Sequence, residues 1–392
     1  MNLVFVSREQ YPNGGAATNR HIAYAKGLIE LGHEVTFILV IEQTSGNREF
    51  IFEGIRFICA IKSDDNYVKY HKIKKAIFSI IRLIKELQIA NDIHKSKKID
   101  ALILLTPLNR DLLSFIWLAK SIKVKVLHER TEYPVVFKRN DKIKLNVYLY
   151  IVLRNVNGIY VINHALKDYL KKYVNVRTPI EIINMIVDPK RFQTEKVGPS
   201  FKQPYIAYCG TLNDEKDGVD ILVKAYANAL NEGKLSADIK LLLIGDYEND
   251  IFRLKLEKVI KSNDCQNNIL FTGLMKRDEV PSILNAASAL VLARPRNKQA
   301  EGGFPTKLGE YLATGKPVII TETGEINLFL KDGFNAFLAK PGDIDNFSEK
   351  IVEVFSDYNR ALEIGSAGRK LVENEFNYYK QAEKLAKFIA SL

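Results

Sequence analysis

The sequence predicts an α/β protein of two domains, each built on a parallel sheet. Its 392 residues exceed the roughly 250–300 that a single hydrophobic core usually serves. Short β-rich runs alternate with amphipathic helical segments along the whole chain, the pattern of strands joined by crossover helices. Residues 187–204 interrupt this alternation with Pro189, Gly198, Pro199 and Pro204. We therefore expect a linker at 191–204 between two halves of similar size, with a cleft between the halves.

The first half, residues 1–190, is expected to form the N-terminal α/β domain. Its predicted strands are 3–6, 34–40, 101–105, 124–127, 158–161 and 181–183. Residues 51–60 add a further strand or a hairpin. Its predicted helices are 17–31, 72–91, 110–121, 142–155 and 164–173.

The second domain is expected at residues 205–375. Its predicted strands are 205–209, 239–244, 269–271, 289–292 and 317–320. Its predicted helices are 218–231, 249–262, 277–286 and a helix of about ten residues after Pro305. A last amphipathic helix, 376–392, is expected to pack back toward the N-terminal domain.

Charge and composition exclude several classes of protein. The net charge is +11, and residues 1–200 hold 32 Lys and Arg against 19 Asp and Glu. Nucleic-acid binding is not indicated, because no recognition motif accompanies these charges. No apolar run reaches the ~18 residues of a membrane span. Cys59, Cys209 and Cys265 are too few and too far apart for a disulfide framework, which fits a reducing cytoplasm.

Residues 69–98 are the most basic amphipathic segment of the chain. Lysines and Arg82 alternate with Ile73, Ile77, Ile80, Ile81 and Ile84. The segment suits a helix on an anionic membrane surface, which would make the protein peripheral on the inner face. The alternative, which the pattern favours, is a surface helix whose apolar side packs on a sheet.

The stretch 294–321 combines a strand end, a glycine turn and a short helix. Gly302 and Gly303 permit the turn, and Pro305 suits the first helical turn. Backbone N–H groups at 304–307 and the Lys307 ammonium form a predicted anion site, and Glu310 can accept hydrogen bonds from a diol such as ribose. The stretch therefore suggests a nucleotide site. The alternative is an ordinary turn in which Lys307 and Glu310 form a solvated ion pair.

Two strand ends of the first half carry candidate site residues. Gly14 and Gly15 follow the first strand, where open α/β sheets bind ligands and backbone can approach a phosphate. His128 and Glu129 end another strand at the same edge, and we take both as catalytic candidates. The alternative for His128 is a capping or packing histidine.

Three turns of the second half lie at the corresponding edge of their sheet. Residues 210–218 include Thr211 and Lys216, residues 245–247 include Asp246, and residues 273–275 include Leu274 and Met275. No histidine cluster has metal-ligand spacing. The pair Asp343 and Asp345 is interpreted as an N-cap and a first-turn acid rather than a metal site.

With these turns in view, the chain resembles the retaining nucleotide-sugar glycosyltransferases of family 4, which have the GT-B fold of two Rossmann-like domains. The resemblance covers essentially the whole chain. It is strongest over 208–321, above all in Gly-Gly-Phe-Pro-Thr-Lys-Leu-Gly-Glu-Tyr-Leu-Ala-Thr-Gly-Lys-Pro-Val-Ile. The implied activity is sugar transfer, with the anomeric configuration kept, to a glycan or lipid-linked acceptor in cell-surface polysaccharide synthesis.

The resemblance also implies roles for single residues. Gly14 and Gly15 would approach the donor phosphate, and His128 would lie on the sugar and acceptor side. Lys216 would neutralise the diphosphate as a catalytic residue, and Glu310 would bind the ribose. Main chain at Leu274 and Met275 would contact the base. The remaining donor-binding candidates are Thr211, Asp246, Arg294, Gly302, Gly303, Phe304, Pro305, Thr306 and Lys307.

The chain departs from the family pattern at two places. Thr211 stands where the family usually has an arginine, and either Lys307 or Arg294 could supply that charge. Eight residues rather than seven separate Glu301 from Glu310, so Gly302 stands at the position of the family's first glutamate. No metal and no cofactor beyond the nucleotide diphosphate sugar are expected. The alternatives are a non-catalytic nucleotide-sugar-binding protein and a GT-B epimerase or phosphorylase.

Overall fold

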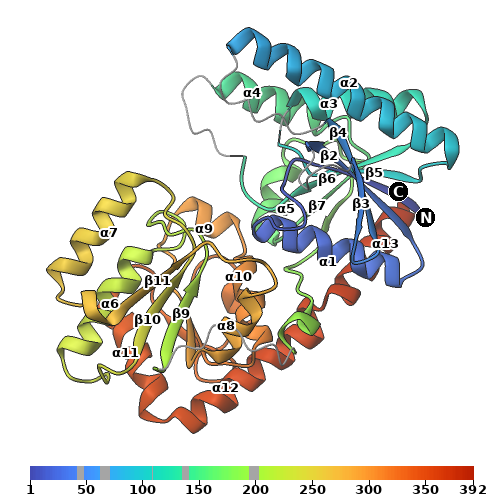
Figure 1. Cartoon of the computed structure of the whole chain (residues 1–392). Helices are drawn as coiled ribbons and strands as arrows, with labels where there is room; N and C mark the ends of the chain where they lie inside the picture. The colour runs from blue at the N-terminus through green and yellow to red at the C-terminus, as the bar shows by residue number, and fades with distance from the viewer. Residues whose placement is uncertain (42–47, 62–70, 108, 135–140, 194–202) are drawn as a thin grey trace. The chain divides into compact units, whose positions relative to one another are not determined.

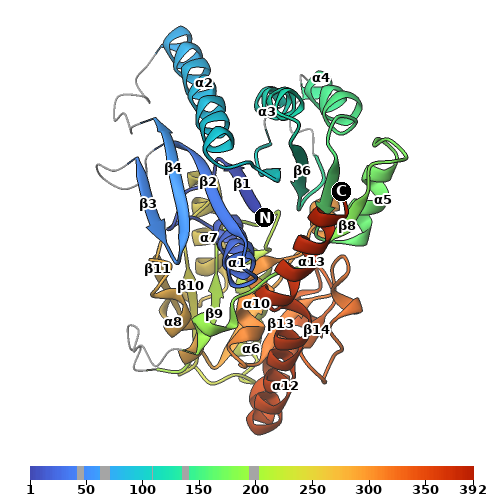
Figure 2. The ribbon, with the colours of Figure 1, turned by 90° about the vertical axis from the view of Figure 1, so that its right-hand side faces the viewer.

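The computed structural model describes residues 1–41, 48–61, 71–107, 109–134, 141–193 and 203–392. It contains two compact units (Figures 1 and 2). Unit 1 comprises Met1–Asn184 and Tyr378–Leu392, and unit 2 comprises Met185–Asn377. The chain therefore enters unit 2 at Met185, before the linker expected at 191–204. Most of that expected linker, residues 194–202, lies outside the described residues.

Unit 1 is built on a sheet of order β3-β4-β2-β1-β5-β6-β7-β8. All its neighbouring strands are parallel except β3 and β4, which form an antiparallel hairpin. The hairpin confirms the second of the two alternatives for residues 51–60. The strands are β1 (Asn2–Ser7), β2 (Glu34–Ile41), β3 (Glu49–Phe52), β4 (Ile55–Ile61), β5 (Ala101–Leu104), β6 (Lys125–Arg130), β7 (Gly158–Val161) and β8 (Ile180–Ile182).

Helices lie on both faces of this sheet (Figure 1). On one face are α1 (Ala16–Glu30) and α13 (Tyr378–Ser391); on the other are α2 (Lys72–Ser96) and α3 (Asn109–Ser121). Unit 1 also contains α4 (Lys142–Val147) and α5 (His164–Lys171). The single helix predicted at 142–155 is wrong in one respect, because α4 passes into a π-helical turn at Tyr148–Val152.

The last helix packs on the first in unit 1. Gly27 of α1 fits closely against α13, where an added Cβ would lie 2.5 Å from the Cβ of Ala382. The Tyr378 hydroxyl donates to the Glu30 carboxylate at 2.7 and 2.8 Å. Figure 1 shows the red helix α13 beside the blue helix α1. Tyr378 and Glu30 are 348 positions apart in the sequence. Unit 1 is thus completed by a segment from near the end of the chain.

Unit 2 has an entirely parallel sheet of order β11-β10-β9-β12-β13-β14. Its strands are β9 (Tyr205–Cys209), β10 (Lys240–Ile244), β11 (Ile269–Gly273), β12 (Ala289–Leu292), β13 (Val318–Thr321) and β14 (Phe337–Ala339). Its helices are α6 (Val219–Asn231), α7 (Asp250–Ser262), α8 (Val280–Ala286), α9 (Lys298–Gly302), α10 (Thr306–Ala313), α11 (Ile344–Ser356) and α12 (Tyr358–Leu371). The predicted strands of this half are all present.

Candidate functional site

The three predicted turns of unit 2 are hydrogen-bonded to one another at the carboxyl edge of the sheet. The Leu212 N–H donates to the Asp246 carbonyl at 2.8 Å, and the Leu274 N–H donates to the Asp246 side chain at 3.1 Å. The Gly245 N–H reaches the Gly273 carbonyl at 3.0 Å. Their gathering at one edge is confirmed. Asp246 is the centre of this arrangement, because both flanking turns bind it.

Lys307 extends from the first turn of α10 to the turn that follows β9. Its ammonium contacts the Asp217 carboxylate and donates to the Tyr208 hydroxyl at 3.1 Å. It also lies so close to Gly210 that an added Cβ there would be 2.3 Å from its Nζ. Burial raises the pKa of Asp217, but the Lys307 charge outweighs this and holds that pKa below its usual range. Lys307 is therefore a charged group beside position 211.

Glu310 pairs with a residue that the sequence patterns do not single out. Its Oε1 accepts a hydrogen bond from Arg191 Nη1 at 3.0 Å, and both side chains are largely buried. Arg191 Nη2 also donates to the Arg277 carbonyl at 3.2 Å. The alternative of a Lys307–Glu310 ion pair is thus not seen, since each of the two residues pairs elsewhere. Arg191 links the predicted ribose ligand to the segment that follows the predicted base loop.

Lys216 and Arg294 meet through the backbone of the turn at 210–218. Arg294 is 2% exposed, and its Nε donates to the Lys216 carbonyl at 3.3 Å. Asn213 Oδ1 accepts from the Lys216 and Asp217 N–H groups at 2.9 Å each. Gly218 has a φ of +64°, and an added Cβ would lie 2.0 Å from the Ala293 carbonyl oxygen. The turn after β9 is therefore fixed against the end of β12.

The segment before α10 is mostly packed into unit 2. Gly302, Gly303 and Pro305 are buried, and Phe304 packs on Phe329 and Phe376 with ring centroids 5.6 and 5.8 Å apart. Glu301 is exposed on the short helix α9. Because α10 begins at Thr306, the N–H groups of its first turn point away from the helix body, as an anion site requires.

His128 is buried in unit 1 with both ring nitrogens engaged. Nδ1 lies 2.8 Å from the Leu104 carbonyl oxygen, and Nε2 lies 3.1 Å from the Tyr148 hydroxyl. The carbonyl can only accept, so Nδ1 carries the proton and Tyr148 donates to Nε2. Burial, with the Arg130 charge, lowers the pKa of His128 to about 4. This geometry favours the alternative of a packing histidine, and contact with substrate stays a prediction.

Glu129, the other catalytic candidate of unit 1, binds two consecutive residues of helix α1, Arg20 and His21. Its oxygens accept from Arg20 Nε and pair with His21 Nε2, each at 2.8 Å. Burial would raise the pKa of Glu129, but the charges of Arg20 and His21 lower it to about 2. Arg20 also donates to the carbonyls of Ile183 and Asn184 at 3.0 and 3.1 Å. The contacts indicate a structural carboxylate that holds α1 in place.

The predicted glycine loop lies at the start of the same helix. Gly15 is the N-cap residue of α1. At Gly14 an added Cβ would lie 2.0 Å from Thr18 Oγ1 and 2.2 Å from the Gln10 carbonyl oxygen, which bond to each other at 2.7 Å. Gly14 is therefore required by close packing, whatever its contact with a donor.

The described residues contain no group of three or more His, Cys, Asp and Glu side chains that could hold a metal. Asp343 accepts from the Asn346 N–H at 2.9 Å, which confirms it as the N-cap of α11. Among the helices of the described parts, none has the length and apolar character needed to cross a bilayer.

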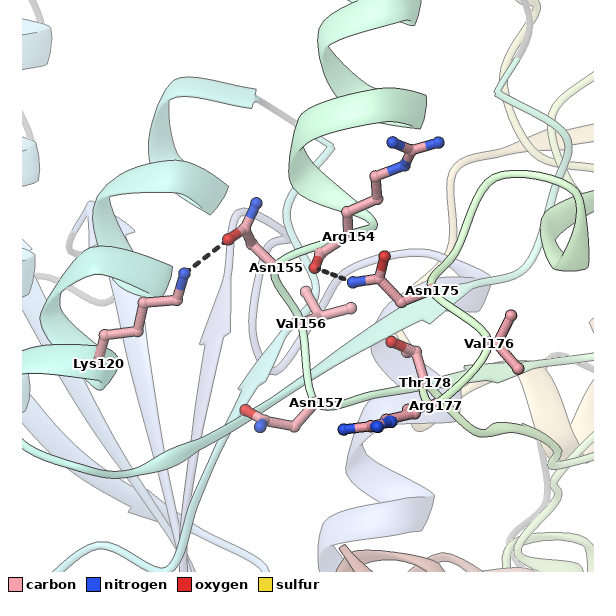
Figure 3. A pocket seen from close by; sticks show the side chains of 9 residues that line it. All are labelled: Lys120, Arg154, Asn155, Val156, Asn157, Asn175, Val176, Arg177 and Thr178. Atoms are coloured by element: carbon pink, nitrogen blue, oxygen red, sulfur yellow. Dashed lines mark hydrogen bonds between the residues drawn. The ribbon is translucent and has the colours of Figure 1, made fainter.

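A hollow of about 550 Å³ lies at the amino edge of the first sheet, away from every predicted site residue (Figure 3). Lys120, Arg154 and Arg177 are among its lining residues. Lys120 is bonded to Asn155 at 2.6 Å, and Arg154 and Arg177 extend in different directions (Figure 3). These cations do not converge on a common point, so we assign the hollow no role.

A protein-family model matches most of the second unit. Residues 203–357 match the model of the family described as glycosyl transferases group 1. The match covers less than half of the chain and shows that this segment is similar to the group 1 glycosyl transferases. The segment contains the turns described above, Lys307 and Glu310, whereas Arg191 lies before its first matched residue.

Solved structures show the fold of the whole chain. The chain is 16% identical to the Anabaena protein Alr3699/HepE, solved in complex with UDP and glucose; the TM-score is 0.74, and both chains are covered completely. Sucrose-phosphate synthase from Thermosynechococcus elongatus gives 16% identity and a TM-score of 0.73, with 100% of this chain and 98% of that chain covered. The predicted GT-B fold of two parallel-sheet α/β domains is confirmed.

Curated relatives are similar to part of the chain. A GDP-mannose-dependent monoacylated alpha-(1-6)-phosphatidylinositol monomannoside mannosyltransferase of Corynebacterium glutamicum is 27% identical over 221 residues, 52% of this chain and 54% of its own. A UDP-Gal:alpha-D-GlcNAc-diphosphoundecaprenol alpha-1,3-galactosyltransferase of Escherichia coli is 30% identical over 162 residues, 41% of this chain and 38% of its own. The chain thus spans about half the length of the curated relatives it matches.

Proposed function

We propose that the protein transfers a sugar from a nucleotide diphosphate sugar to a hydroxyl group of a glycan or lipid-linked acceptor, with retention of anomeric configuration. The observation that carries the proposal is the presence of a cation and a carboxylate one turn apart on α10, each held by its own partner. Lys307 presents an ammonium to the turn after β9, and Glu310, one turn further on, is held by Arg191. A cation for phosphate beside an oriented carboxylate for a diol matches the two hydrophilic parts of a nucleotide.

Lys307 is the better replacement for the arginine missing at Thr211. Its Nζ lies next to Gly210, one residue from that position. Arg294 is instead buried and bonded to the Lys216 backbone, so it supports the turn. In the proposal, Lys307 and Lys216 neutralise the donor diphosphate together with the N–H groups at the start of α10.

The chemistry needs no side-chain nucleophile. The bond between the anomeric carbon and the diphosphate breaks, and the acceptor hydroxyl attacks from the same face. A diphosphate oxygen takes the hydroxyl proton as the nucleoside diphosphate departs. Charge stabilisation on the departing group is then the main contribution of the protein. Cations and backbone dipoles can provide it, so the proposal includes no metal and no further cofactor.

The two curated relatives support transfer as the reaction and lipid-linked molecules as acceptors. Their names specify a phosphatidylinositol mannoside and a diphosphoundecaprenol-linked sugar. By analogy we propose a lipid-linked or glycan acceptor in cell-surface polysaccharide assembly, with the protein at the cytoplasmic face of a membrane. Named transferases among the relatives favour this reaction over epimerisation, phosphorolysis and donor binding without turnover.

Nucleotide binding tests the site without requiring the acceptor. We expect UDP or GDP to bind in calorimetry, and Glu310→Gln to weaken that binding about tenfold, the size of one lost hydrogen bond to a charged group. Arg191→Met should weaken it comparably, because Glu310 loses its orienting partner, while Arg191→Lys should retain part of the affinity. Arg369→Met, which breaks an exposed ion pair with Glu373, is the matched control. Equal nucleotide affinity in all four variants would refute the assignment.

A further inference from the structure

Asp217 is a buried carboxylate next to the ammonium that we place at the donor diphosphate. It is 3% exposed. In the part of the chain that the structure describes, the side chains of Lys307 and Tyr208 donate to its Oδ2. Burial alone would raise the pKa of Asp217, but the Lys307 charge lowers it, so the group is ionised at neutral pH. Lys307 and Asp217 thus form a pair without net charge, and a diphosphate must compete with Asp217 for the ammonium.

The Tyr208 hydroxyl lies between two hydrogen-bond acceptors and has only one proton. Its oxygen is 2.7 Å from the Thr211 carbonyl oxygen and 2.8 Å from Asp217 Oδ2. Neither group can donate in return. Burial raises the pKa of Tyr208 well above its usual value, so the proton stays on the hydroxyl. Tyr208 can therefore donate to only one of the two oxygens at a time, while Lys307 donates to the same hydroxyl at 3.1 Å.

This arrangement contains a replacement partner for Asp217. When Lys307 turns toward a phosphate, Asp217 loses its cation, and a buried carboxylate without a partner is costly. Tyr208 is already within hydrogen-bond distance and can direct its proton to Asp217. The Thr211 carbonyl then retains a second donor, because Asn213 Nδ2 lies 3.1 Å from it. The turn after β9 can thus release Lys307 without leaving a buried acceptor unpaired.

We propose that Asp217 and Tyr208 together set how tightly the site holds the diphosphate. Asp217 favours the free site, because it competes for the Lys307 ammonium. Tyr208 favours the occupied site, because its hydroxyl takes over the hydrogen bond to Asp217 once Lys307 has turned. Both are positioning residues, since they act through Lys307. The inference rests on the donor site of the proposed function and adds to it a reason why the nucleoside diphosphate can leave after transfer.

Calorimetry with UDP and with GDP tests the proposal, since it predicts effects of opposite sign. Asp217→Asn keeps the size and a neutral acceptor, and we expect it to bind the nucleoside diphosphate about tenfold more tightly. The ammonium then no longer has to leave a charged partner. Tyr208→Phe should bind it about tenfold more weakly, the size of one lost hydrogen bond to a charged group.

Two controls show whether the effects pass through Lys307. In a Lys307→Met background, Asp217→Asn and Tyr208→Phe should lose most of their influence on nucleotide affinity. Asp214→Asn removes a carboxylate from the same turn, but one that pairs with Lys255. It should change the affinity by less than about threefold, because an exposed charge is screened by solvent and salt.

The signs of the two effects separate this mechanism from a purely structural role. Weaker binding in both Asp217→Asn and Tyr208→Phe would mean that the two residues only support the turn, and it would overturn the inference. Unchanged affinity in Asp217→Asn would do the same, and neither result contradicts the proposed transfer. Absence of nucleotide binding by the unmodified chain would instead contradict the donor site itself, and the inference with it.

Thermal melting shows which variants are folded. If Asp217→Asn does not fold, Tyr208→Phe alone decides. Binding by Tyr208→Phe that is as tight as that of the unmodified chain, or tighter, would overturn the inference.

Discussion

At the scale of single residues, His128 shows how burial decides protonation. Its pKa is lowered to about 4, chiefly by burial, whereas a histidine in an unfolded chain titrates near 6.5. As the pH falls below about 6.5, the unfolded chain therefore binds a proton before the folded one does, and stability is lost until about pH 4. The full difference amounts to about 3 kcal/mol.

His128→Gln should remove that pH dependence. We expect the variant to be less stable than the unmodified chain at pH 7, because two buried hydrogen bonds are disturbed, but to lose less further stability between pH 7 and pH 4. Urea unfolding at a series of pH values measures both quantities. His164→Gln, at an exposed position, is the control and should leave the slope unchanged. A variant at position 128 with the slope of the unmodified chain would show that His128 titrates normally.

In the proposed donor site, Lys307 is the residue whose loss we expect to lower activity most. Lys307→Met keeps an unbranched side chain that is one atom shorter and removes the charge beside the turn after β9. We expect a loss of about 2–4 kcal/mol of transition-state stabilisation, typical of a group that stabilises developing negative charge. Steady-state kinetics with saturating donor measures it. Lys331→Met, at an exposed lysine, should retain the original rate, and turnover that is equally high in Lys307→Met would contradict the role.

At the scale of elements, the sequence predicts those helices and strands that have a clear apolar periodicity and end at recognisable turn residues. The strands of both sheets other than β14 are recovered because their β-rich runs are bounded by turn residues such as Gly, Pro, Asn and Ser. Helix α12 is missed, since its packed residues include Ala361, Gly365 and Gly368, which leave no large apolar period. At Gly365 an added Cβ would lie 2.5 Å from the Gly315 carbonyl oxygen, so close packing selects small residues here. The three-residue strand β14 is too short for an alternation to appear.

In the candidate site, too, some residues can be predicted from the sequence and others cannot. Glycine turns and the α10 start are local features, so Gly210, Lys307 and Glu310 can be found from the sequence. Their partners cannot, because Arg191 lies 119 positions from Glu310 and Asp217 lies 90 positions from Lys307. The buried state of His128 likewise depends on Leu104 and Tyr148, which belong to other elements. Only the folded chain shows which charges face one another.

Substitution of Gly309 tests the contact between α10 and the first residues of unit 2. An added Cβ would lie 2.3 Å from Val187 Cγ2 and 2.8 Å from Met185 Sδ. Gly309→Ala should therefore destabilise unit 2 by about 1–3 kcal/mol through overpacking. Thermal melting measures the loss, and Val187→Ala in the same chain should recover part of it because space is restored. Strictly additive losses in the double variant would mean that the two residues do not touch.

At the scale of the whole molecule, unit 1 is completed by the end of the chain. Helix α13 buries Tyr378, Ala382, Leu385, Phe388 and Ile389 against unit 1. Removal of residues 378–392 should expose α1 and make unit 1 sensitive to protease, while unit 2 retains its folded core. Limited proteolysis with mass spectrometry locates the cuts. Removal of Leu392 alone is the control, and a fully protected α1 in the longer truncation would contradict the packing.

The proposed reaction moves a sugar from a nucleotide diphosphate donor with retention of configuration. The most direct measurement is nuclear magnetic resonance of a reaction that contains a nucleotide diphosphate sugar and a lipid-linked acceptor. We predict one nucleoside diphosphate released for each sugar transferred, and a product with the anomeric configuration of the donor. Donors that bind but release no nucleoside diphosphate with any lipid-linked or glycan acceptor, or a product of inverted configuration, would contradict the account.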